Sequence, residues 1–425
     1  MKTGRLVVVD GVRTPFCKMG TELAALSADE LGRIAVSALL TRTDIDPALI
    51  DEVIFGCVAQ PADAVNVARV IALRAGIPQS VPAVTVHRNC ASGFEALTQA
   101  QEKLLAGRGN IFVVGGTESM SNIPLLFTAA AAKKFSQLAR AKSFLQRARA
   151  VAAFRPADFK PRIGLMLGLT DPVCNLNMGE TAEVLAREFG IGRNEQDAFA
   201  LQSHQRAAAA RDKLAEEICP VFQNDGAITK DNGIRENQSP EALARLKPQF
   251  DRRNGTVTAG NASQITDGAV ALLVMSEQRA NELGFAPLGA LTGFAYAGCD
   301  PVRMGLGPAH AIALAEKLTG LKLVDADIIE INEAFAAQVL AVVQCAQSEQ
   351  FAREKLHREG ALGEISPEKL NVNGGSIALG HPVGASGARL VLTALKELKR
   401  RNARRALVSL CIGGGQGAAL WLERM

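Results

Sequence analysis

The chain has 425 residues, a formal net charge of +4, and a composition that is 48% hydrophobic but only 4% aromatic. This length supplies two or more domains with large buried cores, and so small a net charge argues against a nucleic-acid-binding protein. Many apolar residues with few aromatic ones favour the α/β class over a sandwich of aromatic-rich strands.

The cysteines exclude two kinds of architecture. They form no C-x-x-C pair and no Cys/His group at metal-ligand spacing, so we expect neither a metal site nor a disulfide framework. The N-terminus has no signal-peptide layout, and no apolar run reaches the length of a membrane span. We therefore predict a soluble protein of a reducing compartment, the cytoplasm. The eight cysteines are Cys17, Cys57, Cys90, Cys174, Cys219, Cys299, Cys345 and Cys411.

The first segment alternates patterns typical of strands and helices. Residues 6–9 predict a strand, and residues 27–40 carry apolar side chains at helical spacing. Residues 52–56 predict a second strand and residues 65–72 a second helix. Such alternation predicts a mostly parallel sheet covered by helices.

The late part of the chain repeats this plan. An Ala-Ser-Gly triplet opens a helix at residues 91–93 and again at 385–387, and each helix leads to an apolar strand that ends in glycines. We infer two related halves with an insertion in the first, and we predict four segments. These are the first part of the N-terminal half (1–120), an inserted loop domain (121–250), the completion of the N-terminal half (251–285) and the C-terminal half (286–425).

Cys90 is the first candidate for chemistry. It stands between an apolar strand at 84–86 and the helix that opens at 91–93. Unpaired N–H groups and the positive end of the helix dipole favour the thiolate at such a place, which makes Cys90 a candidate nucleophile. The alternative is a small buried residue at a strand–helix junction.

His381 is the second candidate. It lies in a glycine-rich segment, residues 373–389, before a helix that starts after the Pro382 turn. Dense glycines let the backbone approach a ligand closely, and imidazole is the side chain best suited to accept a proton near neutral pH. The alternative is a loop that serves packing, with His381 as a capping residue.

Cys411 is the third candidate, at the end of an apolar strand and before the glycines at 413–415. Such a cysteine can act as acid or base beside an oxyanion site made of glycine N–H groups. A dinucleotide phosphate loop is the competing interpretation, but that fold needs a full βαβ unit after the loop, and the sequence ends at Met425. The two-half plan brings Cys90 and Cys411 together. Asn332, after another strand, supplies either an amide that orients water or a helix N-cap.

Seven motifs follow one another in an order that resembles the thiolase family, and they cover nearly the whole chain. They are 12–16 (VRTPF), 89–93 (NCASG), 115–120 (GGTESM), 260–263 (GNAS) with 267–269 (DGA), 332–335 (NEAF), 380–382 (GHP) and 411–415 (CIGGG). The resemblance implies the thiolase fold, an α/β structure in which two similar βαβαβαββ halves form α/β/α/β/α layers. It also implies that the insertion is a mainly helical loop domain covering coenzyme A (CoA).

By this resemblance, Cys90 is the acylated nucleophile, His381 accepts its proton, and Cys411 is the second acid/base. His381 with a water held by Asn332 forms one oxyanion site, and the N–H groups of Cys90 and Gly413 form the other. The implied reaction is CoA-dependent thiolytic cleavage of 3-ketoacyl-CoA to acetyl-CoA and a shortened acyl-CoA, or the reverse Claisen condensation. The alternatives are a ketoacyl-synthase-like condensing enzyme and a non-catalytic lipid-binding protein on the same fold.

The resemblance makes CoA and acyl-CoA substrates, with no permanently bound cofactor and no metal. It implies that Ser263 contacts the pantetheine chain and that Arg235 contacts the nucleotide. Met178, Met304 and Phe335 are expected to line the substrate tunnel.

A basic stretch, residues 133–162, predicts a further contact. It carries nine cations and a single acid, and apolar residues recur in it at helical spacing from Leu138 to Ala152. This pattern predicts a basic amphipathic helix that can lie on anionic lipid; the alternative is a solvated helix that balances the phosphates of CoA. Residues 123–169 and 348–369 resemble thiolase subunits of the fatty-acid β-oxidation complex. This resemblance implies a helical hairpin that lies on membrane or meets the partner dehydrogenase subunit. The expected partners are a hydratase/dehydrogenase subunit, or copies of this chain in a homodimer or homotetramer.

Overall fold

The computed structural model describes residues 4–224 and 226–425. Contacts divide the chain into two compact units: unit 2 is Ile123–Thr170, and unit 1 is the remainder of the described chain. The four segments predicted from the sequence have other boundaries and stay a prediction.

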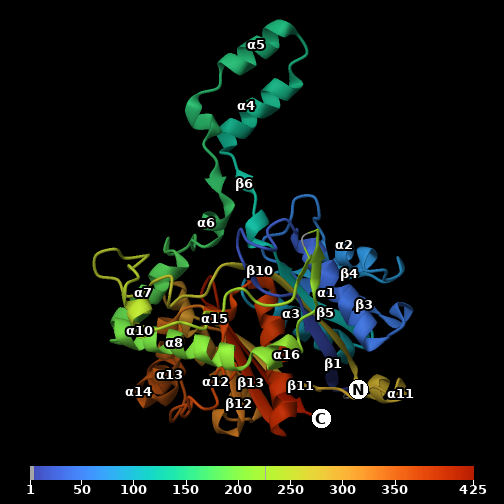
Figure 1. The fold of residues 1–425 in the computed structure, drawn as a ribbon, viewed down its shortest axis with the longest axis vertical. Helices are drawn as coiled ribbons and strands as arrows, with labels where there is room; N and C mark the ends of the chain where they lie inside the picture. Colours follow the sequence, from blue (N-terminus) through green and yellow to red (C-terminus); the bar gives the residue numbers. More distant parts are fainter. Residues whose placement is uncertain (1–3, 225) are drawn as a thin grey trace. The chain divides into compact units, whose positions relative to one another are not determined.

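Unit 1 is built on one ten-stranded sheet (Figure 1). Its strands are β1 (Leu6–Arg13), β2 (Cys17–Lys18), β3 (Glu52–Gly56), β4 (Ala83–Val86), β5 (Ile111–Glu118), β10 (Thr266–Ser276), β11 (Gly289–Gly298), β12 (Ile328–Ile331), β13 (Arg405–Ile412) and β14 (Gln416–Arg424). They follow the order β12-β13-β14-β11-β1-β10-β5-β3-β4, with β2 paired to β10.

The prediction of a mostly parallel sheet is wrong. Parallel pairs join β12 to β13, and β3 to both β4 and β5, whereas the pairs in the middle of the sheet are antiparallel. The reason is that each half ends in a long strand, β10 or β14, that runs antiparallel to both of its neighbours.

The two related halves are confirmed by the strand order. From the β1–β11 pair outwards, β1, β10, β5 and β3 on one side correspond to β11, β14, β13 and β12 on the other. β4 pairs with β3 at one end, and at the matching place Leu370 forms a parallel bridge with Ile329 on β12. The segments that lead to Cys90 and to His381 therefore occupy equivalent positions.

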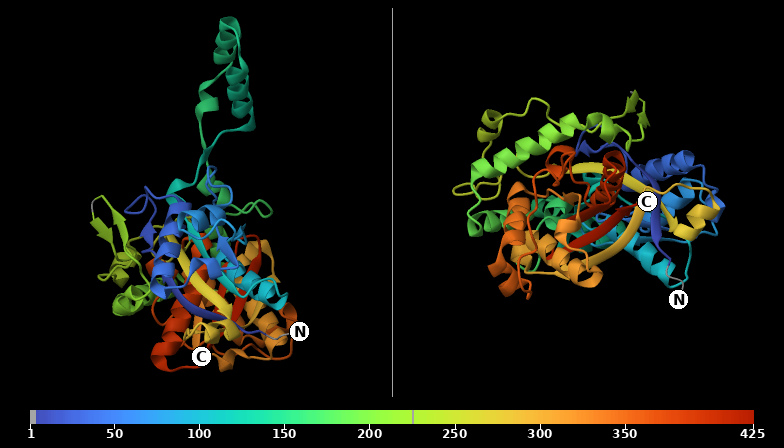
Figure 2. Two further views of the ribbon diagram at one scale, coloured as in Figure 1. Left: turned by 90° about the vertical axis from the view of Figure 1, so that its right-hand side faces the viewer. Right: turned by 90° about the horizontal axis from the view of Figure 1, so that it is seen from below.

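Helices complete five layers. Apolar side chains of α1 and α2 pack on one half of the sheet, those of α12 and α13 pack on the other half, and α3 and α16 lie between the halves. This is the α/β/α/β/α arrangement expected from the family resemblance (Figure 2). The helices of unit 1 are α1 (Ala28–Thr43), α2 (Val67–Arg74), α3 (Ser92–Leu105), α7 (Met178–Glu188), α8 (Arg193–Ala209), α9 (Arg211–Ala215), α10 (Pro240–Ala244), α11 (Glu277–Glu282), α12 (Gly307–Thr319), α13 (Ala336–Gln347), α14 (Glu349–Lys355), α15 (Ser376–Leu379) and α16 (Val383–Arg401). A short hairpin, β8 (Val221–Gln223) and β9 (Gly226–Ile228), stands apart from the large sheet.

Local sequence explains where the long helices end. α1 carries two acids in its first turn and stops where Asp44 takes a left-handed conformation, φ 50°. α16 has three cations in its last turn and stops at Asn402, φ 51°. Acids near a helix N-terminus and cations near the C-terminus are stabilised by the helix dipole, and Asn and Asp tolerate the left-handed residue that ends a helix.

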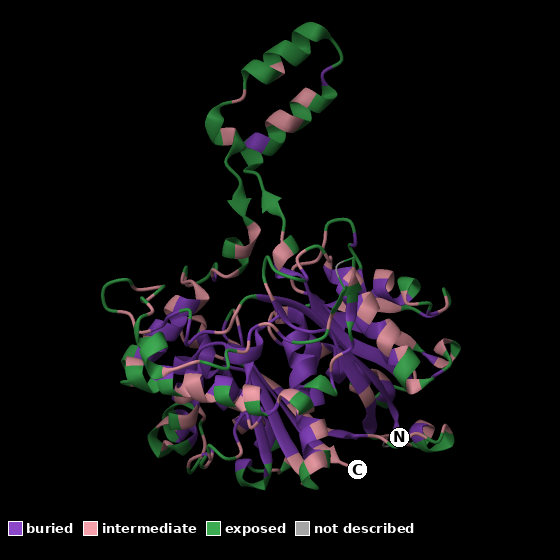
Figure 3. Ribbon diagram, viewed as in Figure 1, coloured by how far each residue is buried: buried purple, intermediate pink, exposed green. Residues whose placement is uncertain are grey.

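The central helices cross at two glycines of the repeated triplets. A Cβ on Gly93 would lie 2.6 Å from the backbone N of Ala388, and a Cβ on Gly387 would lie 2.7 Å from the backbone N of Phe94. Because backbone atoms cannot move aside, the helices approach this closely only where both residues are glycine. The crossing lies near the N-terminal ends of both helices, so it brings the segments before α3 and α16 into one region. α16 and the N-terminal turn of α3 are mostly buried, whereas the C-terminal end of α3 reaches the surface (Figure 3).

Unit 2 contains β6 (Leu125–Leu126), α4 (Ala129–Arg140), α5 (Phe144–Ala152), β7 (Arg162–Ile163) and α6 (Gly164–Gly168). The apolar residues that recur at helical spacing from Leu138 to Ala152 are divided between two helices, because Ser143 forms a capping box with Gln146 and starts a new helix after α4. α4 and α5 contact each other, in agreement with the helical hairpin that the resemblance implies. Phe127, Phe135, Phe154 and Phe159 form a small aromatic cluster within the unit. No helix of the described chain is long and apolar enough to cross a membrane.

Candidate active site

Cys90 lies in a turn between β4 and α3. The Ser92 hydroxyl holds the turn by donating to the Asn89 carbonyl (2.7 Å) and accepting from the Arg88 N–H (2.9 Å). Asn89 has a left-handed φ of 44°, and its Nδ2 donates to the Gly413 carbonyl at 2.8 Å. The loop after β13 is thereby held against the turn, and the backbone N–H of Gly413 donates to the Cys90 sulfur.

Burial is the largest influence on Cys90 and raises the pKa of its thiol to about 11. The backbone N–H groups of Gly413 and of Cys90 itself act in the opposite direction, as expected beside a helix N-terminus, and the Glu118 carboxylate adds to the rise. The predicted preference for thiolate is therefore outweighed by burial. The side chain is a neutral thiol at neutral pH.

Cys411 sits near the end of β13, opposite Gly417 on β14. Its side chain is buried, and burial, followed by the neighbouring Cys90 sulfur, raises the pKa of the Cys411 thiol well above its ordinary value. The two cysteines, far apart in sequence, thus lie close enough to interact. Each of the eight cysteines within the described chain is a free thiol.

His381 is contacted at both ring nitrogens. Its Nδ1 lies 2.6 Å from Oγ of Ser386, in α16, and its Nε2 lies 3.5 Å from Nδ2 of Asn332, which follows β12. Asn332 is held in turn by the Ser376 hydroxyl, 2.6 Å from its Oδ1. Burial lowers the pKa of His381 to about 4, and the Arg389 guanidinium acts in the same direction. The imidazole is therefore neutral near pH 7, with a lone pair available for a proton.

An apolar cluster surrounds the Cys411 sulfur. It includes Met304 and Phe335 as buried members and Met178 as a partly buried one. The Met178 sulfur is 3.4 Å from the place where a Cβ on Gly413 would lie. The three side chains predicted for the tunnel wall thus gather around Cys411, and apolar surroundings strengthen the electrostatic interactions among buried groups.

The two polar residues predicted to contact CoA lie at different places. The Ser263 N–H donates to the carbonyl of Ala334, a member of the apolar cluster, at 2.9 Å. Arg235 is exposed, and its backbone N–H donates to Nδ1 of His204 at 3.2 Å. Its positive charge contributes to lowering the pKa of Lys18, after burial. Arg235 therefore belongs to a separate basic group. Among the described residues, no set of three or more His, Cys, Asp or Glu side chains is placed to hold a metal ion.

Sequence reasoning missed four polar residues that shape this site. Three are Asn89, Ser376 and Ser386, whose contacts are given above. The fourth is Glu118, which is fully buried and accepts three backbone N–H groups: those of Val58 (3.1 Å), Ala59 (2.9 Å) and Gly384 (2.9 Å). Glu118 thereby joins a loop of the first half to the start of α16. All four residues stand inside motifs or glycine-rich segments, and this was the only signal that they have a role.

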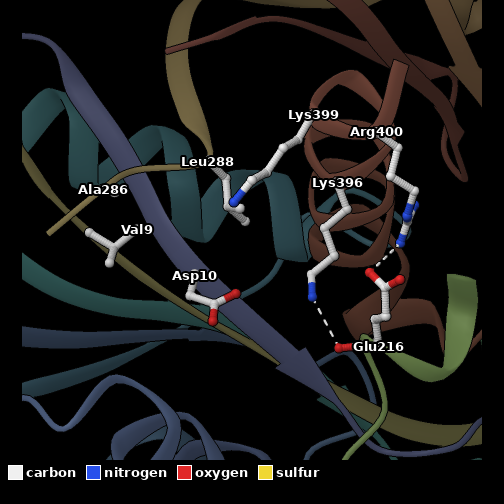
Figure 4. A pocket seen from close by; sticks show the side chains of 8 residues that line it. All are labelled: Val9, Asp10, Glu216, Ala286, Leu288, Lys396, Lys399 and Arg400. Carbon is white, nitrogen blue, oxygen red and sulfur yellow. Dashed lines mark hydrogen bonds and ion pairs between the residues drawn. The ribbon is translucent and has the colours of Figure 1, made fainter. Parts of the chain in front are cut away.

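A separate cavity of about 390 Å³ lies between β1 and the last turns of α16 (Figure 4). Lys396 Nζ donates to the Glu216 carbonyl at 3.0 Å there, and the Arg400 guanidinium donates to the Glu216 carboxylate at 2.9 Å. None of its lining residues belongs to the apolar cluster around Cys411. They are Val9, Asp10, Glu216, Ala286, Leu288, Lys396, Lys399 and Arg400.

Known proteins are similar to this chain in sequence and fold. The family model described as "Thiolase, N-terminal domain" matches residues 6–278, and "Thiolase, C-terminal domain" matches residues 285–424. The chain is 41% identical to the 3-ketoacyl-CoA thiolase of Yersinia enterocolitica and 42% identical to that of Serratia proteamaculans, over 99% of this chain and 97% of each relative.

Solved structures agree with the sequence relatives. The chain is similar to acetyl-CoA acetyltransferase of Bacillus anthracis, with a TM-score of 0.86, 36% identity and coverage of 99% of both chains. It is also similar to human mitochondrial 3-ketoacyl-CoA thiolase in complex with CoA, with a TM-score of 0.85, 36% identity and coverage of 99% of this chain and 98% of that chain. The chain belongs to the thiolase family.

Proposed function

We propose that this protein catalyses CoA-dependent thiolysis of 3-ketoacyl-CoA to acetyl-CoA and a shortened acyl-CoA, and the reverse Claisen condensation, through an acyl group on Cys90. The observation that carries the proposal is the proximity of two neutral thiols, the partly buried Cys90 and the buried Cys411. The similarity to relatives named 3-ketoacyl-CoA thiolase, at more than 40% identity, supports the same reaction. A condensing enzyme of the ketoacyl synthase type has no need of the second thiol.

In the proposed cleavage, Nε2 of His381 takes the Cys90 proton while the sulfur attacks the keto carbon of the substrate. The bond between that carbon and the α-carbon breaks, which leaves an acyl group on Cys90 and the enolate of acetyl-CoA. Cys411 gives its proton to the enolate carbon, and acetyl-CoA departs. A neutral imidazole and a neutral thiol are the protonation states that these two transfers require.

The second half of the reaction returns both protons. The thiol of free CoA gives its proton to the Cys411 thiolate, and the CoA sulfur attacks the acyl carbon. The Cys90 thiolate leaves and recovers its proton from His381. Each side chain thus ends in the state in which it began.

Negative oxygen develops in both halves of the reaction, so donors are needed. We assign the oxygen of the attacked keto carbon, which becomes the thioester oxygen of acyl-Cys90, to the N–H groups of Cys90 and Gly413. We assign the thioester oxygen of the acetyl-CoA enolate to His381 with a water on Asn332. The hydrogen bond from Gly413 to the Cys90 sulfur supports the first assignment. Loss of one such donor costs roughly 3 to 4 kcal/mol of barrier.

We also propose that Ser263 contacts the pantetheine chain of CoA and Arg235 its nucleotide. The cytoplasm fits this chemistry, because both thiols must stay reduced. We propose a homodimer or homotetramer on the basis of the family resemblance.

We further propose that α5 of unit 2 docks on an anionic membrane or on a hydratase/dehydrogenase subunit. Phe144, Leu145 and Val151 are 89%, 61% and 58% exposed on this helix, and Arg147 and Arg149 stand between them. Exposed apolar groups beside cations suit the surface of an anionic bilayer. Flotation with anionic and neutral vesicles tests this: binding to anionic vesicles that Phe144→Ser reduces supports the membrane, and no binding to either favours the protein partner.

The reaction is tested by following consumption of short, medium and long 3-ketoacyl-CoAs. Cys90→Ser and Cys411→Ser should each lower kcat by at least about 1000-fold, because each removes a group that takes part in bond making. Cys345→Ala removes another buried thiol, outside the site, and should keep the wild-type rate. Undiminished activity in Cys90→Ser, or no thiolysis of any substrate by the wild-type protein, would contradict the proposal.

A further inference from the structure

We infer that Ser376 and Ser386 act as positioning residues: they set the direction of a hydrogen-bond chain that keeps the proton of neutral His381 on Nδ1 and leaves Nε2 free. The inference rests on the proposed function, since it explains how His381 is ready to take the Cys90 proton. It concerns groups to which no role was assigned above.

This chain of hydrogen bonds has four links. Ser376 Oγ lies 2.6 Å from Asn332 Oδ1, and Asn332 Nδ2 lies 3.5 Å from His381 Nε2. His381 Nδ1 lies 2.6 Å from Ser386 Oγ, which lies 3.0 Å from the Pro382 carbonyl. Ser376, Asn332 and Ser386 are 0% exposed and His381 is 8% exposed, so these groups must satisfy one another.

The heavy atoms allow two arrangements of the protons. In the first, Ser376 donates to Asn332, the Asn332 amide donates to Nε2, Nδ1–H donates to Ser386, and Ser386 donates to the Pro382 carbonyl. In the second, the Asn332 amide is turned over. It then accepts from Nε2–H and donates to Ser376, while Ser386 donates to Nδ1.

The hydroxyl proton of Ser376 decides between them. Within the described chain, this hydroxyl has one acceptor, Asn332 Oδ1. With the amide turned over, the Ser376 hydroxyl faces another donor and its proton has no acceptor. Buried polar groups almost always find a partner, so the first arrangement prevails. Nδ1 then carries the proton, and the Nε2 lone pair meets only the long contact to Asn332.

This direction has a consequence for proton transfer. When Nε2 takes a proton, the Nδ1–H bond to Ser386 persists and no side chain has to rotate; only the 3.5 Å contact to Asn332 is given up. A base whose tautomer and ring orientation are set before the reaction has no reorganisation to undergo during it. Without Ser386, the ring can adopt the tautomer that presents an N–H to Cys90.

The experiment combines ¹⁵N NMR of protein labelled at its five histidines with steady-state thiolysis. The His381 signals are identified by their absence from His381→Asn. The wild-type protein should show the proton on Nδ1. Ser386→Ala should populate the Nε2–H form and lower kcat/KM by about 10- to 100-fold, by analogy with residues that orient metal-bound imidazoles. Ser376→Ala should also lower kcat/KM, because Asn332 can then turn over.

Thr393→Ala is the matched control, because it removes another buried hydroxyl of α16, one that donates to Glu217 at 3.0 Å. It should change neither the tautomer nor kcat/KM. The inference is overturned if the wild-type protein carries the proton on Nε2, or if Ser386→Ala leaves both the tautomer and kcat/KM unchanged. If a serine variant does not fold, the wild-type spectrum alone decides. A wild-type protein with the Nδ1–H tautomer but no thiolysis would contradict the proposed function and leave this inference intact.

Discussion

Gly93→Ala tests whether the close crossing of α3 and α16 positions the catalytic groups. The added Cβ would lie 2.6 Å from the backbone N of Ala388, whereas ordinary contact begins at 3.4 Å. The helices must therefore separate by roughly the difference, ~0.8 Å, at a point three residues after Cys90. Overpacking of this kind costs about 1 to 3 kcal/mol of folding free energy. Because a displacement near 1 Å of reacting groups costs on the order of 100-fold in rate, kcat should fall by about that factor.

Thermal unfolding and thiolysis kinetics of the same preparation measure both effects. Gly168→Ala is the control: this glycine ends α6, and a Cβ there would meet nothing within 4 Å. It should keep the wild-type rate and unfold at the wild-type temperature or slightly above, because alanine favours helix. If Gly93→Ala retains the wild-type melting temperature and rate, the glycine crossing does not position the site.

Three further predictions concern other parts of the account. Asn89→Gly keeps the left-handed turn but loses the hydrogen bond to the Gly413 carbonyl, so its kcat should be about 10-fold lower. The kcat of Asn89→Ala should be lower still, because a left-handed alanine costs ~1–2 kcal/mol. Equal rates in the wild-type protein and both variants would refute this. Burial lowers the pKa of both His204 and His381 from 6.5 to about 4. As the pH drops from 6.5 to 4, these histidines therefore bind protons in the unfolded chain but not in the folded one. The free energy of unfolding should fall over this range by up to ~3 kcal/mol per histidine. Urea unfolding across this range should show a smaller loss for His204→Gln, and an identical loss would count against burial as the cause. Burial raises the pKa of the Glu330 carboxyl to about 8 although Arg389 acts against this, so in Arg389→Met the carboxyl takes up a proton and keeps a buried polar group without its partner. The variant should lose about 1–3 kcal/mol of folding free energy. Addition of Glu330→Gln should not lower the melting temperature much further; a large additional loss in the double variant would contradict this.

Strands and helices with strong periodicity could be located from the sequence to within about four residues at each end. The strand expected at 52–56 is β3, and the helix expected at 27–40 is α1. Strand direction was harder, since alternation of strands and helices indicates crossovers but does not report the hairpin that follows. A signal was present: Gly414 and Gly415, with φ of 90° and 80°, make the tight turn between β13 and β14. The sequence pattern alone assigns these glycines to an oxyanion site or a phosphate loop and does not reveal the turn.

The candidate site was predictable as a set of motifs but not as a set of contacts. Asn89 and Gly413 are separated by 324 positions in the chain, and their hydrogen bond exists only because both halves fold against one another. The charge state of Cys90 was equally out of reach. A helix N-terminus can be seen in the sequence, whereas burial, which is the larger effect on this thiol, depends on packing from the whole of unit 1.

The central claim is that Cys90 carries the acyl group, and trapping that group tests it most directly. The protein is mixed with a 3-ketoacyl-CoA in the absence of free CoA, quenched in acid, digested and examined by peptide mass spectrometry. The account predicts one acyl group per chain on the peptide containing Cys90, its loss when CoA is added before the quench, and no acylation of Cys90→Ala. Formation of acetyl-CoA with no acyl group on Cys90, or with the group on another side chain, would contradict it.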